Sequence, residues 1–465
     1  MYHLLPFNFT NIDNNDVLIN ELGDLLVTPA GTAKSIILHE LEEDTDLYKT
    51  LVSNYFITKD PLPSTFAIYA ERLAEKKRFL DDKTSLHLFV LTLRCNQRCS
   101  YCQASSLDSS CQNVTMTQHC LKRAVDLMFE SPSNHLTMEF QGGEPSLEPK
   151  LLRIGIEYAL KKNEEEKRDL TFVLCSNCID ITEEVLDICK QFDVLVSTSL
   201  DGPEWLHNNN RGKHNSYKKV INGISIVRNV LGQDRVSALM TTSVLSLKYP
   251  LEIVDEYVSQ GFNDIFLRSL NPYGLAKNND NWDDYIEQFI SFYIKALDYI
   301  IDLNKRGIFI RENFTSIILR KILTPWNSGF VDLQSPAGIV NSVLVYNYDG
   351  KVYASDESRM LAEHGDLTFC LGSIDDDYDQ LIFSLKTRKW ADLWNNEVLA
   401  GCSSCPYKSY CGADPVRNYS TQGDMYGFRP TSLVCKKNYA IINHIIRLLV
   451  TRHSEVYPIF MSWIR

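Results

Sequence analysis

The stretch L-R-C-N-Q-R-C-S-Y-C-Q-A-S, residues 93–105, places three cysteines within eight positions: Cys95, Cys99 and Cys102. We expect no export signal in the opening residues, and clustered thiols in a reducing compartment indicate metal ligands or catalytic groups. Cysteine thiolates are the usual protein ligands of iron–sulfur clusters. Three thiolates leave one iron of a [4Fe–4S] cluster free to bind a substrate or cofactor. The alternative is a zinc site with a remote fourth ligand.

The sequence around this stretch alternates apolar, strand-like runs with amphipathic helical runs. Repeated strand–helix units predict an α/β fold with a parallel sheet or barrel. In such barrels the chemistry lies at the carboxyl ends of the strands, where the cysteine stretch is found. The predicted strands cover residues 86–93, 136–140, 170–176, 194–200, 237–244 and 264–270, with helices such as 150–160 and 217–227 between them.

Polar motifs follow three further predicted strands. The motif Q-G-G-E-P (141–145) has two glycines, which let the backbone approach a ligand closely, and a carboxylate. Ser176-Asn177 ends the third strand, and S-L-D-G-P (199–203) ends the fourth, with Arg211 shortly after. By itself, Q-G-G-E-P is also compatible with an ordinary turn. The motifs that end the third and fourth strands are compatible with capped turns, and Arg211 with a surface cation.

The C-x3-C-x2-C motif directly after the first strand, together with G-G-E-P, resembles the radical S-adenosylmethionine (SAM) superfamily. The resemblance implies a partial (β/α)6 barrel, a [4Fe–4S] cluster on Cys95, Cys99 and Cys102, and SAM at the open iron. The residues that it places around SAM are Tyr101 (adenine), Gly142, Gly143 and Glu144 (amino group), Ser176 and Asn177 (ribose or carboxylate), Ser199 or Asp201 (sugar), and Arg211 (carboxylate).

A second cysteine group lies in G-C-S-S-C-P-Y-K-S-Y-C-G (401–412), followed by Cys435. Four thiolates close a cluster completely, as an electron-transfer centre requires, although a zinc site has the same ligand set. The spacing of Cys402, Cys405 and Cys411 resembles the SPASM extension of peptide-modifying radical SAM enzymes. A full extension carries two clusters, but Pro415 stands where a further cysteine is expected. We therefore predict one auxiliary [4Fe–4S] cluster, held by Cys402, Cys405, Cys411 and Cys435.

Several further residues have weaker assignments. Cys175 and Cys178 form a C-x2-C pair at the end of the third strand and are predicted to be free thiols, because SAM occupies that end of the barrel. Cys370 is left unassigned. Two acid–arginine pairs, Asp356 with Arg359 and Asp414 with Arg417, are candidates for a substrate-facing base and clamp, with loop salt bridges as the alternative.

We predict three units, covering residues 1–83, 84–310 and 311–465. In the first, residues 17–27 predict two strands and residues 31–56 two short helices. This order resembles a winged-helix peptide-recognition element, and a capping domain is the alternative. The barrel closes with a long helix near 282–306, and the third unit begins with a hairpin over 343–355 and ends in a helix near 436–450.

The segment C-G-A-D-P-V-R-N-Y-S-T-Q-G-D-M-Y-G-F-R-P-T-S-L-V-C (411–435) and the opening Y-H-L-L-P-F-N-F resemble the HxsB family of radical SAM maturases, which belongs to the His-Xaa-Ser repeat peptide system. The resemblance implies a ribosomal precursor peptide with such repeats, a second radical SAM protein as partner, and a small electron donor such as flavodoxin or ferredoxin. The expected activity is modification of the peptide, by crosslinking. The alternatives are oxidation of a Ser or Cys, as in sulfatase maturation, and a non-catalytic metal scaffold.

Composition excludes some classes of function. The formal net charge of −12 and the pI of about 5.4 argue against a nucleic-acid partner held by bulk electrostatics. No run of 18 apolar residues predicts a membrane span. We expect a cytoplasmic protein with no membrane partner.

Overall fold

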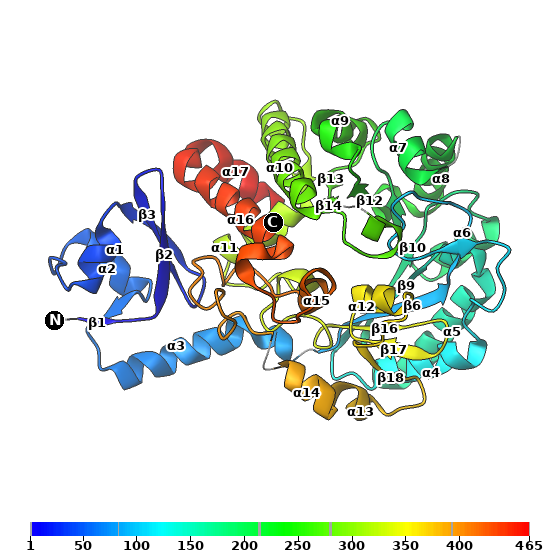
Figure 1. Ribbon diagram of the computed structural model, residues 1–465, viewed down its shortest axis with the longest axis horizontal. Helices are drawn as coiled ribbons and strands as arrows, with labels where there is room; N and C mark the ends of the chain where they lie inside the picture. The colour runs from blue at the N-terminus through cyan, green and yellow to red at the C-terminus, as the bar shows by residue number, and fades with distance from the viewer. Residues whose placement is uncertain (1, 82, 213–214, 279–280, 392–393, 465) are drawn as a thin grey trace.

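The computed structural model describes residues 2–81, 83–212, 215–278, 281–391 and 394–464. Met1, which begins the first predicted unit, and Arg465, which ends the third, lie outside these ranges. Figure 1 shows the N-terminal unit in blue at one side and the barrel at the other, with the C-terminal helices between them.

The predicted partial (β/α)6 barrel is confirmed. Its six strands run parallel in the order β14-β12-β11-β10-β9-β6. They are β6 (Leu86–Thr92), β9 (His135–Gly142), β10 (Asp169–Cys175), β11 (Leu195–Ser199), β12 (Val236–Thr242) and β14 (Leu267–Ser269). The helices of the barrel region are α4 (Gln118–Phe129), α5 (Pro149–Glu166), α6 (Glu183–Gln191), α7 (Glu204–Arg211), α8 (Ser216–Leu231), α9 (Pro250–Ser259) and α10 (Trp282–Lys305). Short elements complete it: β7 (Arg94–Cys95), β8 (Leu107–Asp108), β13 (Asp264–Ile265), η2 (Pro145–Leu147), η3 (Gln233–Arg235), η4 (Ser246–Lys248) and η5 (Gly274–Asn278).

The alternation of side chains along each strand separates the core from the barrel interior. On β9, Leu136, Met138 and Phe140 are buried in the main hydrophobic core. Glu139 and Gln141 alternate with them and line an interior cavity. The period of two therefore directs polar groups of an otherwise apolar strand toward the barrel axis.

The sheet continues beyond the six predicted strands. The expected hairpin over 343–355 forms as β16 (Val343–Tyr346) and β17 (Lys351–Tyr353), with Gly350 in the turn at φ +81°. β16 pairs in parallel with β6, and β17 continues to β18 (Cys370–Ser373), which makes a sheet of nine strands. All four residues of β16 are buried, so the hairpin covers the edge that β6 would otherwise expose.

The N-terminal unit contains the three-stranded antiparallel sheet β2-β3-β4, with helices α1 and α2 packed on a core of their own. β3 and β4 are the two strands predicted over 17–27, whereas β2 and the long helix α3 were not predicted. β2 escaped prediction because its sequence F-N-F-T-N-I is largely polar. The elements are β1 (His3–Leu4), β2 (Phe7–Ile12), β3 (Asn15–Asn20), β4 (Leu25–Pro29), α1 (Thr32–Ile37), α2 (Asp46–Ser53), β5 (Ile57–Thr58), α3 (Leu62–Lys76) and η1 (Arg78–Leu80).

The C-terminal region packs directly on the barrel. One hydrophobic core contains barrel residues such as Phe140 together with C-terminal residues such as Ile442. The boundary predicted between residues 310 and 311 therefore does not divide the hydrophobic core. Helix α17 was not predicted, because Pro458 inside it normally signals a helix end. The elements are β15 (Arg311–Glu312), α11 (Asn313–Leu323), η6 (Val331–Leu333), α12 (Asp356–Ala362), α13 (Tyr378–Phe383), α14 (Leu385–Ala391), α15 (Pro415–Gln422), η7 (Arg429–Thr431), α16 (Leu433–Thr451) and α17 (His453–Trp463).

His87 on β6 predicts how the fold responds to acid. The ring is fully buried between the Thr84 carbonyl (2.9 Å) and the Tyr346 hydroxyl (3.0 Å), and burial lowers its pKa to about 4. The unfolded chain takes up this proton near pH 6.5, so the stability from a neutral His87 is lost as pH falls from about 6.5 toward 4, by about 3 kcal/mol. We expect the urea midpoint of His87→Gln to fall less over this range than that of the wild type. An equal fall of the urea midpoint in His87→Gln and in the wild type would contradict the prediction.

Candidate active site

The three cysteines of residues 93–105 line one cavity of about 290 Å³ at the carboxyl ends of the barrel strands. Cys95 ends β7, and Cys99 and Cys102 lie in the loop that follows. This loop is tied to its surroundings, because the Ser100 amide donates to the Asn210 carbonyl and the Leu275 amide to the Cys102 carbonyl, each at 2.8 Å. The predicted residues that also line the cavity are Tyr101, Gly142, Gly143, Glu144, Ser176, Asn177, Ser199 and Arg211.

Gly142 and Gly143 have a packing reason that the sequence did not reveal. A Cβ on Gly142 would lie 2.3 Å from the Thr92 carbonyl oxygen, and one on Gly143 would lie 2.3 Å from that of Arg94. Gly142 also has a φ of +130°, a conformation that favours glycine. The glycines therefore let the end of β9 pack directly on the backbone that leads to Cys95, which brings G-G-E-P to the cysteine loop.

Glu144 is buried and held by backbone amides on both carboxylate oxygens. Its Oε1 accepts from the Ser146 amide at 3.1 Å, and its Oε2 accepts from the Asn177 amide at 2.8 Å. Burial raises the pKa of this carboxyl above its usual value. The carboxyl thus connects the ends of β9 and β10, and it faces the cavity with lone pairs that an ammonium group can use.

Asp201 does not line the cavity. It is fully buried behind the wall, where it accepts from Arg211 Nε (3.1 Å) and Nη2 (2.9 Å) and from the Tyr101 hydroxyl (2.5 Å). Burial alone would raise the pKa of Asp201, but Arg211 holds it below the usual value. Asp201 therefore positions Tyr101 and Arg211, and its contact with the sugar stays a prediction. The Nη1 atom of Arg211 is not used by Asp201 and lies 3.8 Å from the Cys99 sulfur, which lines the cavity.

The two cysteines of the C-x2-C pair at the end of β10 have different surroundings. Cys175 lines the cavity and donates to Glu139 Oε1 at 3.3 Å. Cys178 is fully buried in the main core, with a φ of +55°. Both are unpaired thiols.

The second cysteine group converges although its members are distant in sequence. Cys402, Cys405, Cys411 and Cys435 line one cavity of about 40 Å³. Cys435 lies in the first turn of α16, and burial raises the pKa of its thiol above the usual value. Burial raises the pKa of Cys402 to about 11 and that of Cys405 to about 12, so these thiols stay protonated unless a metal binds them. Cys370, on β18, does not line this cavity.

The spacing of the cysteines argues against single zinc ions. Within the described ranges, no three His, Cys, Asp or Glu side chains are close enough together to hold one metal ion. A zinc site requires about 2.3 Å from each sulfur to one central atom, whereas the ligands of an iron–sulfur cluster bind different irons. Two groups of cysteines, each around its own cavity, therefore fit clusters better than mononuclear zinc.

The two acid–arginine pairs differ. The first forms the salt bridge that was the alternative to a catalytic role, although Asp356 also lines the cavity. Asp356 Oδ1 accepts from Arg359 Nε at 2.9 Å, and Arg359 is 1% exposed. Asp414 caps α15 by accepting from the Arg417 amide at 2.9 Å, without a side-chain ion pair. Arg417 Nη1 instead donates to Asn271 Oδ1 at 2.7 Å.

Sequence reasoning missed several polar residues that line the cavity, among them Gln97, Glu139, Gln141 and Arg268. Two of them interrupt apolar strands, Glu139 in L-T-M-E-F and Arg268 in I-F-L-R-S-L. A charged residue in the middle of a buried strand was the available signal, because it is retained only where it faces a cavity or a partner.

A comparison with protein families identifies the region of the chain that contains this site. Residues 89–254 match the model of the Radical SAM superfamily. The chain carries a radical SAM domain. The predicted SAM and [4Fe–4S] cluster agree with this domain, although the assignment of individual residues to SAM stays a prediction.

Relatives of the radical SAM domain extend over most of the chain. A cysteine-type anaerobic sulfatase-maturating enzyme of Clostridium novyi is 22% identical over 338 residues, covering 70% of this chain and 85% of that enzyme. The structure of native anSMEcpe with bound AdoMet and the Cp18Cys peptide covers 80% of this chain and 99% of its own, with 18% identity and a TM-score of 0.65. Streptococcus suis SuiB bound to precursor peptide SuiA covers 93% and 100%, with 13% identity and a TM-score of 0.55.

Helices that cross membranes are long and apolar, and none among the described residues meets both conditions.

Proposed function

We propose that this protein is a radical SAM maturase that modifies, by crosslinking, a ribosomally made peptide with His-Xaa-Ser repeats. When bound, SAM and a reduced [4Fe–4S] cluster supply a 5′-deoxyadenosyl radical that abstracts a hydrogen atom from a substrate. The chain's own residues hold the cofactors and exclude water: Cys95, Cys99 and Cys102 bind the cluster, and Glu144, Ser176, Asn177, Ser199 and Arg211 surround SAM.

The observation that carries the proposal is the presence of two cysteine sites with a polar chamber between them, which shares a wall residue with each site. Arg268 lines both the cavity at the first cysteine site and a second chamber. Val434 lines both that chamber and the cavity at Cys402, Cys405, Cys411 and Cys435. A crosslink removes a second electron from the substrate after hydrogen abstraction, so an auxiliary [4Fe–4S] cluster next to the substrate space is a fitting acceptor.

The N-terminal unit offers a site for the peptide. In the sheet β2-β3-β4, the outer strands β2 and β4 each have one unpaired edge within the described chain. An extended peptide binds such an edge as an added strand. SuiB, whose structure contains a precursor peptide, aligns with 93% of this chain, and this supports a peptide substrate.

The test is the intact mass of a His-Xaa-Ser repeat peptide co-expressed anaerobically with this chain and a flavodoxin. We expect loss of hydrogen pairs with the wild type and none with the Cys95/Cys99/Cys102→Ala variant. Fragmentation then places the new bond. An unchanged mass, also after addition of a second radical SAM protein, would contradict the proposal.

A second candidate is the oxidation of a single Ser or Cys, which the similarity to the Clostridium novyi enzyme favours. Oxidation of Ser removes two hydrogens and leaves an aldehyde. Oxidation of Cys removes two hydrogens to give a thioaldehyde, which takes up water and releases hydrogen sulfide to give the same aldehyde. The aldehyde reacts with hydrazine reagents, and no crosslink forms. A peptide whose mass falls and which labels with hydrazine would favour this candidate. The scaffold alternative predicts no SAM cleavage at all.

A further inference from the structure

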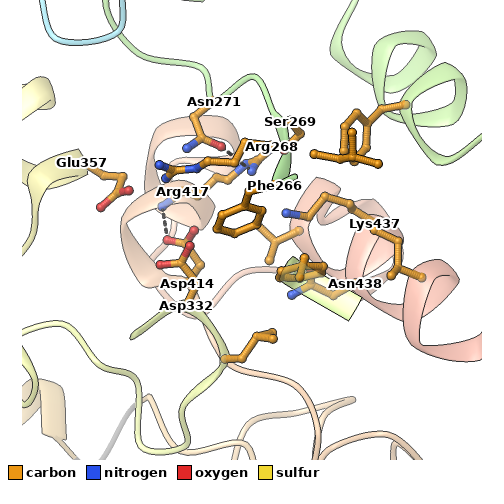
Figure 2. A pocket seen from close by; sticks show the side chains of 16 residues that line it. Phe266, Arg268, Ser269, Asn271, Asp332, Glu357, Asp414, Arg417, Lys437 and Asn438 are labelled. Atoms are coloured by element: carbon orange, nitrogen blue, oxygen red, sulfur yellow. Dashed lines mark hydrogen bonds between the residues drawn. The ribbon is translucent and has the colours of Figure 1, made fainter. Parts of the chain in front are cut away.

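The chamber between the two cysteine sites, called here the interior chamber, has a volume of about 50 Å³. Its walls come from β14, η6, α12, α15 and α16, and Figure 2 shows their polar side chains converging. Six charged residues line it: Arg268, Arg417, Lys437, Asp332, Glu357 and Asp414. Only the Asp414–Arg417 pair was singled out from the sequence.

The interior chamber lies between the cofactor sites. Arg268 reaches it from the cavity at the first cysteine site. On the other side, Asn438 lines the chamber and its Nδ2 lies 3.6 Å from the sulfur of Cys411. A group bound in the chamber would therefore lie between the radical-generating site and the second cysteine site.

The charges of the interior chamber do not neutralise one another by direct pairing. Within the described part of the chain, no ion pair joins any two of the six residues. Arg268 and Lys437 instead lie over the rings of Phe266 (5.6 Å) and Phe314 (5.4 Å). Charged groups inside a protein are normally paired or hydrogen-bonded, because an unpaired charge costs several kcal/mol. Asp414 and Arg417 already make hydrogen bonds with neighbouring residues. Within the described chain the side chains of Arg268, Lys437 and Asp332 have no such partner, so they can receive hydrogen-bonding groups from elsewhere.

The arrangement of charge indicates what kind of group fits. In Figure 2, Asp332 and Asp414 lie together on one side of Phe266, with Arg268 and Lys437 on other sides of it. A group with a single charge would be attracted by one set and repelled by the other. A neutral group with a donor and an acceptor satisfies both. The Phe266 and Phe314 rings stack on each other, 19° from parallel with centroids 6.2 Å apart, and give the chamber an aromatic wall whose edges a planar group can contact.

Glu357 adds a donor to the acidic side of the chamber. Burial, with Asp332, Asp356 and Asp414 nearby, raises its pKa to about 8, although Arg268, Arg417 and Lys437 also face the chamber. At pH 7 the carboxyl is therefore mostly protonated and can donate a hydrogen bond.

We propose that the interior chamber binds one side chain of the substrate, a planar uncharged group that carries both a hydrogen-bond donor and an acceptor, such as an imidazole or a carboxamide. This proposal rests on the proposed peptide substrate. The volume fits the end of a side chain, since one water molecule needs roughly 10–15 Å³ of such space.

The test measures binding independently of turnover. Imidazole, acetamide, acetate and methylammonium serve as probes of the reconstituted protein at pH 7, with saturating SAM to keep imidazole from the first cluster. Ligand-observed NMR titrations report each affinity. We expect imidazole and acetamide to bind at least about tenfold more tightly than the two charged probes. Equal or tighter binding of acetate or methylammonium would overturn the proposal.

Variants locate the bound probe. Arg268→Gln and Asp414→Asn are expected to weaken imidazole and acetamide binding about tenfold, and Asn at position 414 still caps α15. Arg235→Gln and Asp193→Asn, which break an exposed ion pair elsewhere, are the matched controls. Probe binding that both chamber variants leave unchanged would place the probe elsewhere and overturn the proposal.

The two proposals fail in different ways. Probe binding in the chamber with no peptide modification would contradict the proposed function alone. Peptide modification with no probe binding, and with kcat/KM unchanged in Arg268→Gln, would contradict the chamber proposal alone.

Discussion

Replacing Cys95, Cys99 and Cys102 together by alanine is expected to abolish reductive cleavage of SAM, on the order of 1000-fold or more. The three sulfurs line the cavity of the radical SAM domain, so the variant loses every protein ligand of that cluster. Iron content should fall by one cluster, while the second cysteine group keeps its own. The measurement is 5′-deoxyadenosine formation under dithionite, with iron and sulfide analysis of the same samples.

A matched control is available in the same region of the chain. Cys111 and Cys120 are partly exposed thiols that do not line the cavity. The Cys111/Cys120→Ala variant should keep the iron content and the SAM cleavage of the wild type. Cleavage within tenfold of the wild type in the triple variant would contradict the assignment of the radical site.

Asp201→Asn is expected to lower the free energy of unfolding by about 3 kcal/mol or more and to weaken SAM binding. The buried Arg211 loses its charge partner, and a buried charge left unpaired costs about 3–5 kcal/mol. Tyr101 and Arg211, which line the cavity, also lose the carboxylate that orients them. Urea unfolding of the apoprotein and equilibrium SAM binding measure the two effects.

Two further variants separate the lost ion pair from a general effect of the substitution. Asp193→Asn removes a carboxylate from the exposed pair with Arg235, which is worth at most about 1 kcal/mol. Asp201→Asn/Arg211→Met removes both charges of the buried pair and should recover part of the lost stability, but not the affinity for SAM. A single variant no less stable than Asp193→Asn would refute the role given to Asp201.

Local features of the chain were predictable. The strands β6, β9, β10, β11 and β12 follow from apolar runs of the right length, and the Thr182 cap of α6 follows from its side chain and the acids after it. The first three cysteines lie within eight residues, so one loop brings them together. These features depend on neighbours in sequence, which is why pattern and spacing sufficed.

The glycines of G-G-E-P and the acid Asp201 have interactions that could not be predicted from the local sequence alone. The motif was interpreted through a ligand, yet the close approach that excludes a Cβ is to the carbonyl oxygens of Thr92 and Arg94. Asp201 was considered for the sugar, yet Tyr101 and Arg211 use its oxygens. The approach of Gly142 to Thr92 and the bond between Tyr101 and Asp201 join segments 50 and 100 residues apart, which no local pattern encodes.

The sequence by itself determined the radical SAM domain, because strand periodicity and the spacing of Cys95, Cys99 and Cys102 are properties of short segments. Only the tertiary structure decided that β16 extends the barrel sheet, that Asp201 binds Tyr101 and Arg211, and that Arg268 and Glu357 line one interior chamber. Burial of apolar surface drives these long-range contacts, but the hydrophobic effect is not directional. The close packing of the whole chain therefore determines which polar groups become neighbours.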